Sequence, residues 1–156
     1  MDTRYNQVKD LMKWAAGYHA RMAKRYSDGA ERTDDERLSM ALTYLATREV
    51  KMRSGLEALF HDGSDHSEVM ELWFDESGDF PQPPKLDAIV ESNVSTSIDG
   101  VIETASEAQE NLRALYAHRA ECAKIEAERT FFDALAQGHE AELRKIVTSI
   151  REFEDI

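Results

Sequence analysis

Four polar residues interrupt the apolar stripes of this 156-residue sequence: His19, Glu49, Gln109 and His139. Each lies where helical spacing of three and four residues predicts an apolar side chain. Imidazole, carboxylate and carboxamide groups are costly to bury unless they are paired, hydrogen-bonded or bound to a metal. His and Glu ligate metals, and all three types can also satisfy one another by hydrogen bonds. The pattern therefore predicts a polar layer inside an apolar core.

A weak internal repeat of 90 residues relates these four positions. The shift places residue 19 on 109 and residue 49 on 139. It also matches apolar stripe positions: Ala15 with Ala105, Met22 with Leu112, Tyr26 with Tyr116, and Leu42 with Phe132. Such self-similarity indicates a duplicated structural unit. We expect two equivalent helical hairpins, with their polar residues at equivalent heights.

Two long proline-free blocks carry the stripes, and each block is typical of two helices. In the first block, residues 27–29 (Ser-Asp-Gly) predict the end of one helix, with Gly29 in a left-handed conformation. Thr33 followed by Glu36 is a capping-box pattern that predicts the start of the next helix. In the second block, the break between the helices falls within residues 120–124. These signals predict four helices of similar length.

The segment between the blocks is acidic and holds every proline. Residues 61–100 contain ten acidic residues and one base, Lys85. Residues 75–84 are predicted to be a loop, with short helices around residues 66–74 and 86–92. A connector of this length can run along the whole bundle, which lets the second and third long helices lie parallel.

The fold prediction is an all-α, antiparallel four-helix bundle with one long crossover between helices two and three. A single domain is expected over residues 1–156. It consists of a hairpin at 5–62, an acidic crossover at 63–97 and a second hairpin at 98–153.

This organisation resembles the ferritin-like, rubrerythrin-type superfamily. The resemblance rests on Tyr-Leu-Ala-x-x-Glu-x-x-Met at 44–52 and on Phe-x-x-Leu-Ala-x-x-His-x-x-Glu at 132–142. His19 with Tyr26, and Gln109 with Tyr116, have the spacing at which the family places a Glu and a Tyr. In members that bind two irons, two helices each supply a Glu and the other two each supply Glu-x-x-His.

The sequence departs from that ligand pattern at five of the six positions, since only Glu49 matches outright. Met52 and Gln109 replace a His and a Glu, and both are poor ligands for iron. The competent ligands that remain are His19, Glu49, His139 and Glu142, and they predict a reduced site for one Fe, Mn or Zn ion. The alternative is a degenerate layer that forms only hydrogen bonds.

Two functions follow from these alternatives. The first is a non-catalytic binding or structural module that has lost the ordinary diiron site. The second is a metal-dependent oxidoreductase or metal-binding protein with one ion in the bundle core. The resemblance to a helical bundle also leads us to expect a homo-oligomer, most simply a dimer.

Composition limits the partners. A formal net charge of −12 opposes binding to nucleic acid or to an anionic membrane. No apolar run is long enough to cross a membrane, and the first residues lack the apolar stretch of a signal peptide. With Cys122 as the single cysteine, we expect a cytoplasmic protein. The segment at 70–74, Met-Glu-Leu-Trp-Phe, either docks a protein partner at the acidic crossover or covers the protein's own core.

Overall fold

The computed structural model describes residues 7–61, 65–74 and 83–154, and their regular secondary structure is entirely helical. The four long helices are α1 (Val8–Arg32), α2 (Glu36–Glu57), α5 (Ile98–Glu121) and α6 (Glu126–Glu154). The shorter elements are η1 (Ala58–Phe60), α3 (Ser67–Met70) and α4 (Pro83–Glu91). The all-α prediction is confirmed. Among the helices in these ranges, none has both the length and the apolar character needed to span a membrane.

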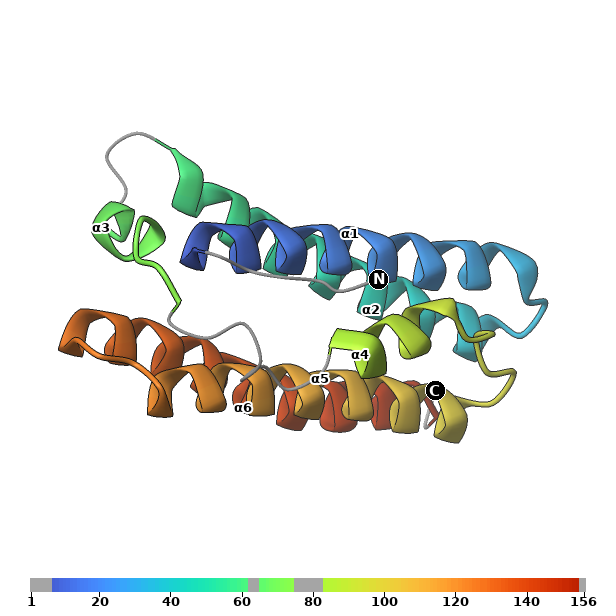
Figure 1. Ribbon diagram of the computed structural model, residues 1–156. Helices are drawn as coiled ribbons and strands as arrows, with labels where there is room; N and C mark the ends of the chain where they lie inside the picture. Colours follow the sequence, from blue (N-terminus) through green and yellow to red (C-terminus); the bar gives the residue numbers. More distant parts are fainter. Residues whose placement is uncertain (1–6, 62–64, 75–82, 155–156) are drawn as a thin grey trace.

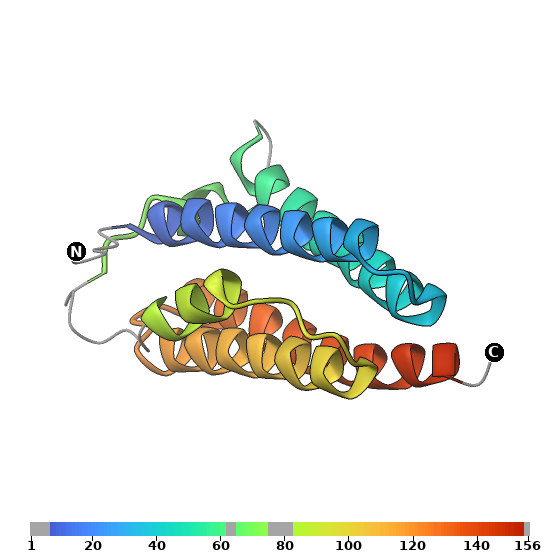
Figure 2. The same cartoon turned by 90° about the vertical axis from the view of Figure 1, so that its right-hand side faces the viewer.

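The long helices form two antiparallel hairpins, α1 with α2 and α5 with α6. Figure 1 shows that α2 and α5 run in the same direction, as the length of the connector between them predicts. The hairpins lie against each other as two layers (Figure 2). Contacts are dense within each hairpin and sparser between the two. Among the described residues, the backbones of long helices in different hairpins approach closely only through α2, which contacts α5 and α6.

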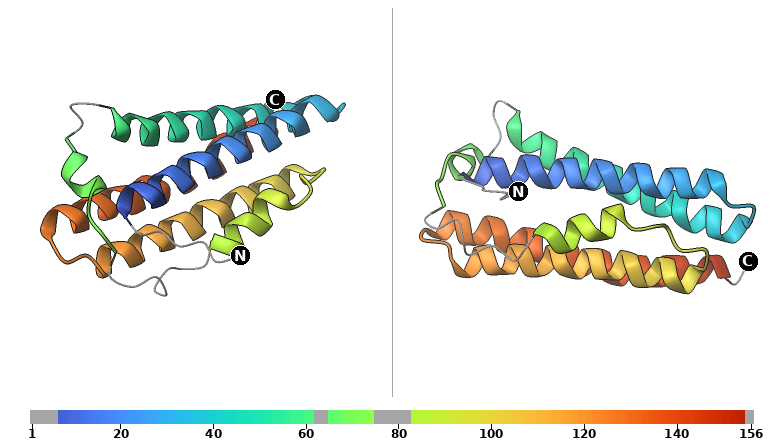
Figure 3. Two further views of the ribbon diagram at one scale, coloured as in Figure 1. Left: turned by 45° about the horizontal axis from the view of Figure 1, so that its top comes forward. Right: turned by 45° about the vertical axis from the view of Figure 1, so that its right-hand side comes forward.

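Short elements of the connector cover parts of this arrangement. α3 contacts α1, η1 and α6 at the end of the molecule where α1 and α6 begin. α4 lies along α5 and also touches α1 (Figure 3). Residues 75–82 of the predicted loop lie outside the described residues, and residues 83 and 84 belong to α4 rather than to a loop.

The predicted end of the first helix at residues 27–29 is wrong, because α1 continues to Arg32. Gly29 lies inside the helix, where a Cβ would meet Val94 Cγ1 at 3.2 Å and Leu42 Cδ1 at 3.3 Å. The glycine therefore permits close packing against α2 and the connector, and it does not adopt a left-handed end.

The start of α2 also differs from the capping box predicted at Thr33. Asp35 is the N-cap, and its carboxylate accepts hydrogen bonds from the backbone N–H groups of Arg37 and Leu38. Thr33 Oγ1 instead accepts a hydrogen bond from the backbone N–H of Asp35. Thr33 and Asp35 are both residue types that cap helices, and Asp35 is the one that caps α2.

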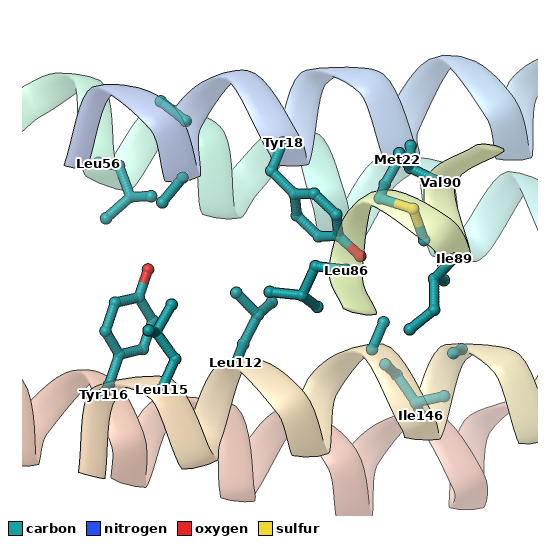
Figure 4. Close-up of a cluster of buried hydrophobic side chains, with 14 of the residues drawn as sticks. Tyr18, Met22, Leu56, Leu86, Ile89, Val90, Leu112, Leu115, Tyr116 and Ile146 are labelled. Carbon is teal, nitrogen blue, oxygen red and sulfur yellow. The ribbon is translucent and has the colours of Figure 1, made fainter. Parts of the chain in front are cut away.

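Apolar side chains from both layers and from the connector fill the core (Figure 4). Leu86, Ile89 and Val90 of α4 are buried among residues of α1 and α5. The α1–α5 edge between the hairpins is therefore covered by α4.

Only part of the segment at 70–74 has the predicted role of covering the core. Met70 is buried, and Phe74 packs on the core, with its ring 6.3 Å from that of Phe132 and under the Arg119 guanidinium at 4.3 Å. Trp73 is 68% exposed, so it does not cover the core. The covering role holds for its neighbours but not for the tryptophan.

Candidate functional site

The four polar residues singled out in the sequence all lie in the core, one on each long helix. His19 is on α1, Glu49 on α2, Gln109 on α5 and His139 on α6, and all four are buried. Their neighbours along the helices are the apolar residues of the stripes, which explains why each polar group points inward.

Hydrogen bonds join these four side chains into one chain. His19 Nδ1 lies 2.7 Å from Glu49 Oε1, and His139 Nδ1 lies 2.6 Å from Gln109 Oε1. A longer contact of 3.4 Å, from Gln109 Nε2 to Glu49 Oε2, links the two pairs across the hairpins. The imidazole rings of His19 and His139 stack on each other, with 5.8 Å between their centroids and an angle of 12° between their planes.

The internal repeat appears directly in this geometry. In each hairpin, the bonded partners are 30 residues apart in sequence, and the bond uses a histidine Nδ1. The partners have exchanged helices, however, since the histidine is on the first helix of one hairpin and on the second helix of the other. The equivalent heights predicted from the 90-residue shift are consistent with these contacts.

The directions of the hydrogen bonds follow from the chemistry of the groups. A carboxylate only accepts, so Gln109 must turn its amide NH₂ toward Glu49. Its carbonyl oxygen then faces His139, whose Nδ1 must carry the proton. Burial, and secondarily the charge of His19, lower the pKa of His139 to about 3. His139 is therefore a neutral imidazole near pH 7, with a lone pair on Nε2.

Glu142, the fourth predicted ligand, is buried but lies with Arg48 instead of in the hydrogen-bonded chain. Arg48 Nε donates to Glu142 Oε1 at 2.7 Å and to Oε2 at 3.1 Å. This pair bridges α2 and α6. Arg48 was absent from the predicted site because its neighbours in sequence are charged and suggest a solvated face. Its position three residues after Leu45 and four before Met52, both on the apolar stripe, was the signal that could have identified it.

A cavity of about 690 Å³ adjoins these polar groups. It lies between the C-terminal half of α2 and the N-terminal half of α6, and α3 borders one end. His19, His139, Arg48 and Glu142 all line it, so the cavity touches both the hydrogen-bonded chain and the Arg48–Glu142 pair. Met52, at a further family ligand position, also lines this cavity.

Most of the cavity wall is apolar. Its side chains include Leu56, Leu59, Val69, Phe131 and Leu135. Two glycines also line it, Gly55 and Gly138, and a Cβ built at either would have no neighbouring atom within 4 Å. Small residues on both facing helices therefore leave this volume unfilled.

Aromatic rings flank the imidazole stack on both sides. Tyr116 stacks on His139 at 5.4 Å, and Tyr18 meets His19 edge-on at 6.0 Å. Burial raises the pKa of both phenols. Within the described ranges, neither hydroxyl has a hydrogen-bond partner, and that of Tyr116 points from α5 toward the first hairpin (Figure 4). Tyrosine rings thus cover part of the imidazole stack, while both histidines also border the cavity.

Among residues 7–61, 65–74 and 83–154, no three His, Cys, Asp or Glu side chains gather as a metal-binding group. The predicted set is divided: His19 hydrogen-bonds to Glu49 and stacks on His139, whereas Glu142 binds Arg48. Comparisons of the chain with models of protein families, with curated proteins and with solved structures found no match.

Proposed function

We propose that this chain is a ferritin-like four-helix bundle that has lost the ordinary diiron site and acts as a non-catalytic binding module. The parallel direction of α2 and α5, and the two equivalent hydrogen-bonded pairs, support the ferritin-like topology. The cavity between α2 and α6 is the binding site. Its volume lies in the range of about 300–1,000 Å³ that is typical of small-molecule sites.

One observation carries this proposal: protein groups already occupy the carboxylates that a metal would need. Glu49 accepts hydrogen bonds from His19 and Gln109 on its two oxygens, and both oxygens of Glu142 accept from Arg48. A buried carboxylate with such partners is satisfied without a metal ion. The donor set therefore suits a hydrogen-bond network better than a metal centre.

A fragment screen followed by NMR chemical-shift changes tests the binding role. Fragments that bind should shift the amide signals of cavity residues such as Leu56 and Leu135, and leave those of the α1–α5 edge unchanged. A screen without binders, or with binders only at other surfaces, would contradict the proposal.

A single-metal site is the second candidate, and the two stacked imidazoles favour it. His19 and His139 lie 5.8 Å apart between ring centroids, and both border the same cavity as Glu142. Elemental analysis after growth with iron, manganese and zinc separates the candidates. A stoichiometric metal that disappears in His139→Ala supports the metal site, whereas a metal-free protein with unchanged thermal stability in chelator supports the binding module.

A further inference from the structure

The inner end of the cavity offers hydrogen-bond acceptors. His139 uses Nδ1 to donate to Gln109, so the nitrogen that remains for a ligand is the unprotonated Nε2. The Glu142 carboxylate lies on the same wall and also accepts. A ligand group that binds to His139 Nε2 or to Glu142 must therefore bring its own donor, and a hydroxyl group meets that requirement.

The charges around the cavity disfavour an ionic ligand. Asp65 and Glu126 lie on its exposed lining and repel an anion. Glu142 is already neutralised by Arg48, so a buried ammonium group would remain without a counter-charge. A neutral molecule avoids both costs.

The remaining wall selects an apolar body. Leu56, Val69 and Phe131 are buried side chains that border the cavity, and Leu59 and Leu135 add further apolar surface. An aromatic ring with an alkyl tail would cover these surfaces.

We propose that the cavity binds a neutral, largely apolar hydroxylated molecule of the alkylphenol type, whose hydroxyl group donates to His139 Nε2. This inference rests on the proposed binding function and specifies the ligand chemistry of the same site.

Three probes with the same ring and tail test the proposal in calorimetric titrations of the full chain. They are para-hexylphenol, its methyl ether para-hexylanisole, and the anion para-hexylbenzoate. The phenol should bind about tenfold more tightly than the ether, since one buried hydrogen bond is lost. The benzoate should bind at least about a hundredfold more weakly than the phenol, because its charge would be buried unpaired.

Glycine substitutions locate the binding without touching a polar group. Gly138→Leu and Gly55→Leu each place a side chain in the cavity and should abolish phenol binding. Gly17→Leu is the matched control, because Gly17 is also helical with open space at its Cβ but does not line the cavity. The affinity of Gly17→Leu for the phenol should equal that of the native protein. Circular dichroism should show all three variants folded, since leucine favours helix more than glycine.

The outcomes separate the ligand chemistry from the binding role. If phenol and ether bind equally, or benzoate binds most tightly, and Gly138→Leu still abolishes binding, the hydroxyl inference is overturned while the binding module stands. If none of the probes binds and the fragment screen is also empty, both proposals fail. Loss of the phenol preference in His139→Leu, with ether binding retained, would assign the acceptor to His139.

Discussion

The two hairpins hold equivalent hydrogen-bonded pairs that differ in their chemical groups. His19 with Glu49 contains a carboxylate, whereas Gln109 with His139 contains only neutral groups. The spacing of 30 residues and the use of Nδ1 are the same in both. The two pairs thus share one geometry but differ in chemistry, and Gln109 Nε2 of the neutral pair donates to Glu49.

The two edges between the hairpins differ in a similar way. At the α1–α5 edge, Leu86, Ile89 and Val90 of α4 fill the space. At the α2–α6 edge, Gly55 and Gly138 leave a cavity. The connector therefore fills one edge with α4, whereas at the other edge it only borders an open cavity.

The largest expected effect comes from removing the acceptor that both pairs share. Glu49→Leu leaves two buried donors without a partner, His19 Nδ1–H and Gln109 Nε2–H, whereas His139→Leu leaves one acceptor, Gln109 Oε1. Each orphaned group costs about 1–3 kcal/mol, so Glu49→Leu should lower the free energy of unfolding about twice as much. Urea unfolding of both variants measures this, and equal losses would show that the pairs are independent.

The neutral pair should make stability depend on pH. Unfolded His139 has a pKa near 6.5, and folding lowers it to about 3. At a pH above the pKa of unfolded His139, this residue is neutral in both the folded and the unfolded protein. Below that pKa, His139 is protonated in the unfolded protein but stays neutral in the folded one. The free energy of unfolding therefore falls as the pH decreases. The slope from this residue approaches about 1.4 kcal/mol per pH unit.

Two variants separate the effect of His139 on the pH dependence of stability from the effect of the many carboxylates. His139→Leu should remove it, while His61→Gln, at an exposed histidine, should leave the profile of the native protein unchanged. Profiles of native protein and His139→Leu that stay parallel between about pH 6 and about pH 4 would refute a neutral buried His139.

Arg48 shows how much an ion pair at the border of the cavity contributes to stability. Arg48→Met leaves the buried Glu142 carboxylate without its guanidinium partner and should cost about 1–3 kcal/mol. Arg113→Met is the control, because Arg113 pairs with Glu110 on the surface and such pairs contribute about 0–1 kcal/mol. Chemical unfolding compares the two, and similar small losses would mean that Glu142 is not held by Arg48.

The smallest effect is expected beside the neutral pair, at Tyr116. Its hydroxyl is buried and has no hydrogen-bond partner among the residues that the structure describes. Tyr116→Phe keeps the stack on His139 and should change the free energy of unfolding by less than about 1 kcal/mol, in the stabilising direction. A larger loss in a thermal melt would reveal a partner for this hydroxyl.

Periodicity was enough to place the four polar residues in the core. His19 and Glu49 interrupt stripes of spacing three and four, and the 90-residue shift pairs them with Gln109 and His139. The parallel direction of α2 and α5 was also predictable, because the connector is long enough to return along the molecule. These features depend on patterns that extend over many residues.

Features that depend on a single neighbour were not predictable. Gly29 is the type of residue that ends a helix, but its close approach to Val94 and Leu42 exists only once the elements are packed. The same holds for Glu142, whose partner Arg48 lies on another helix. The cavity is a property of small residues on two facing helices, and neither helix alone indicates it.

The central claim is that a neutral His139 donates through Nδ1 to Gln109 and keeps Nε2 free of a proton. Nitrogen-15 NMR of the imidazoles reads this tautomer directly. We predict a protonated Nδ1 and an unprotonated Nε2 for His139 at both about pH 8 and about pH 5. A signal of the opposite tautomer, or one that titrates with a pKa near the ordinary histidine value, would contradict the account.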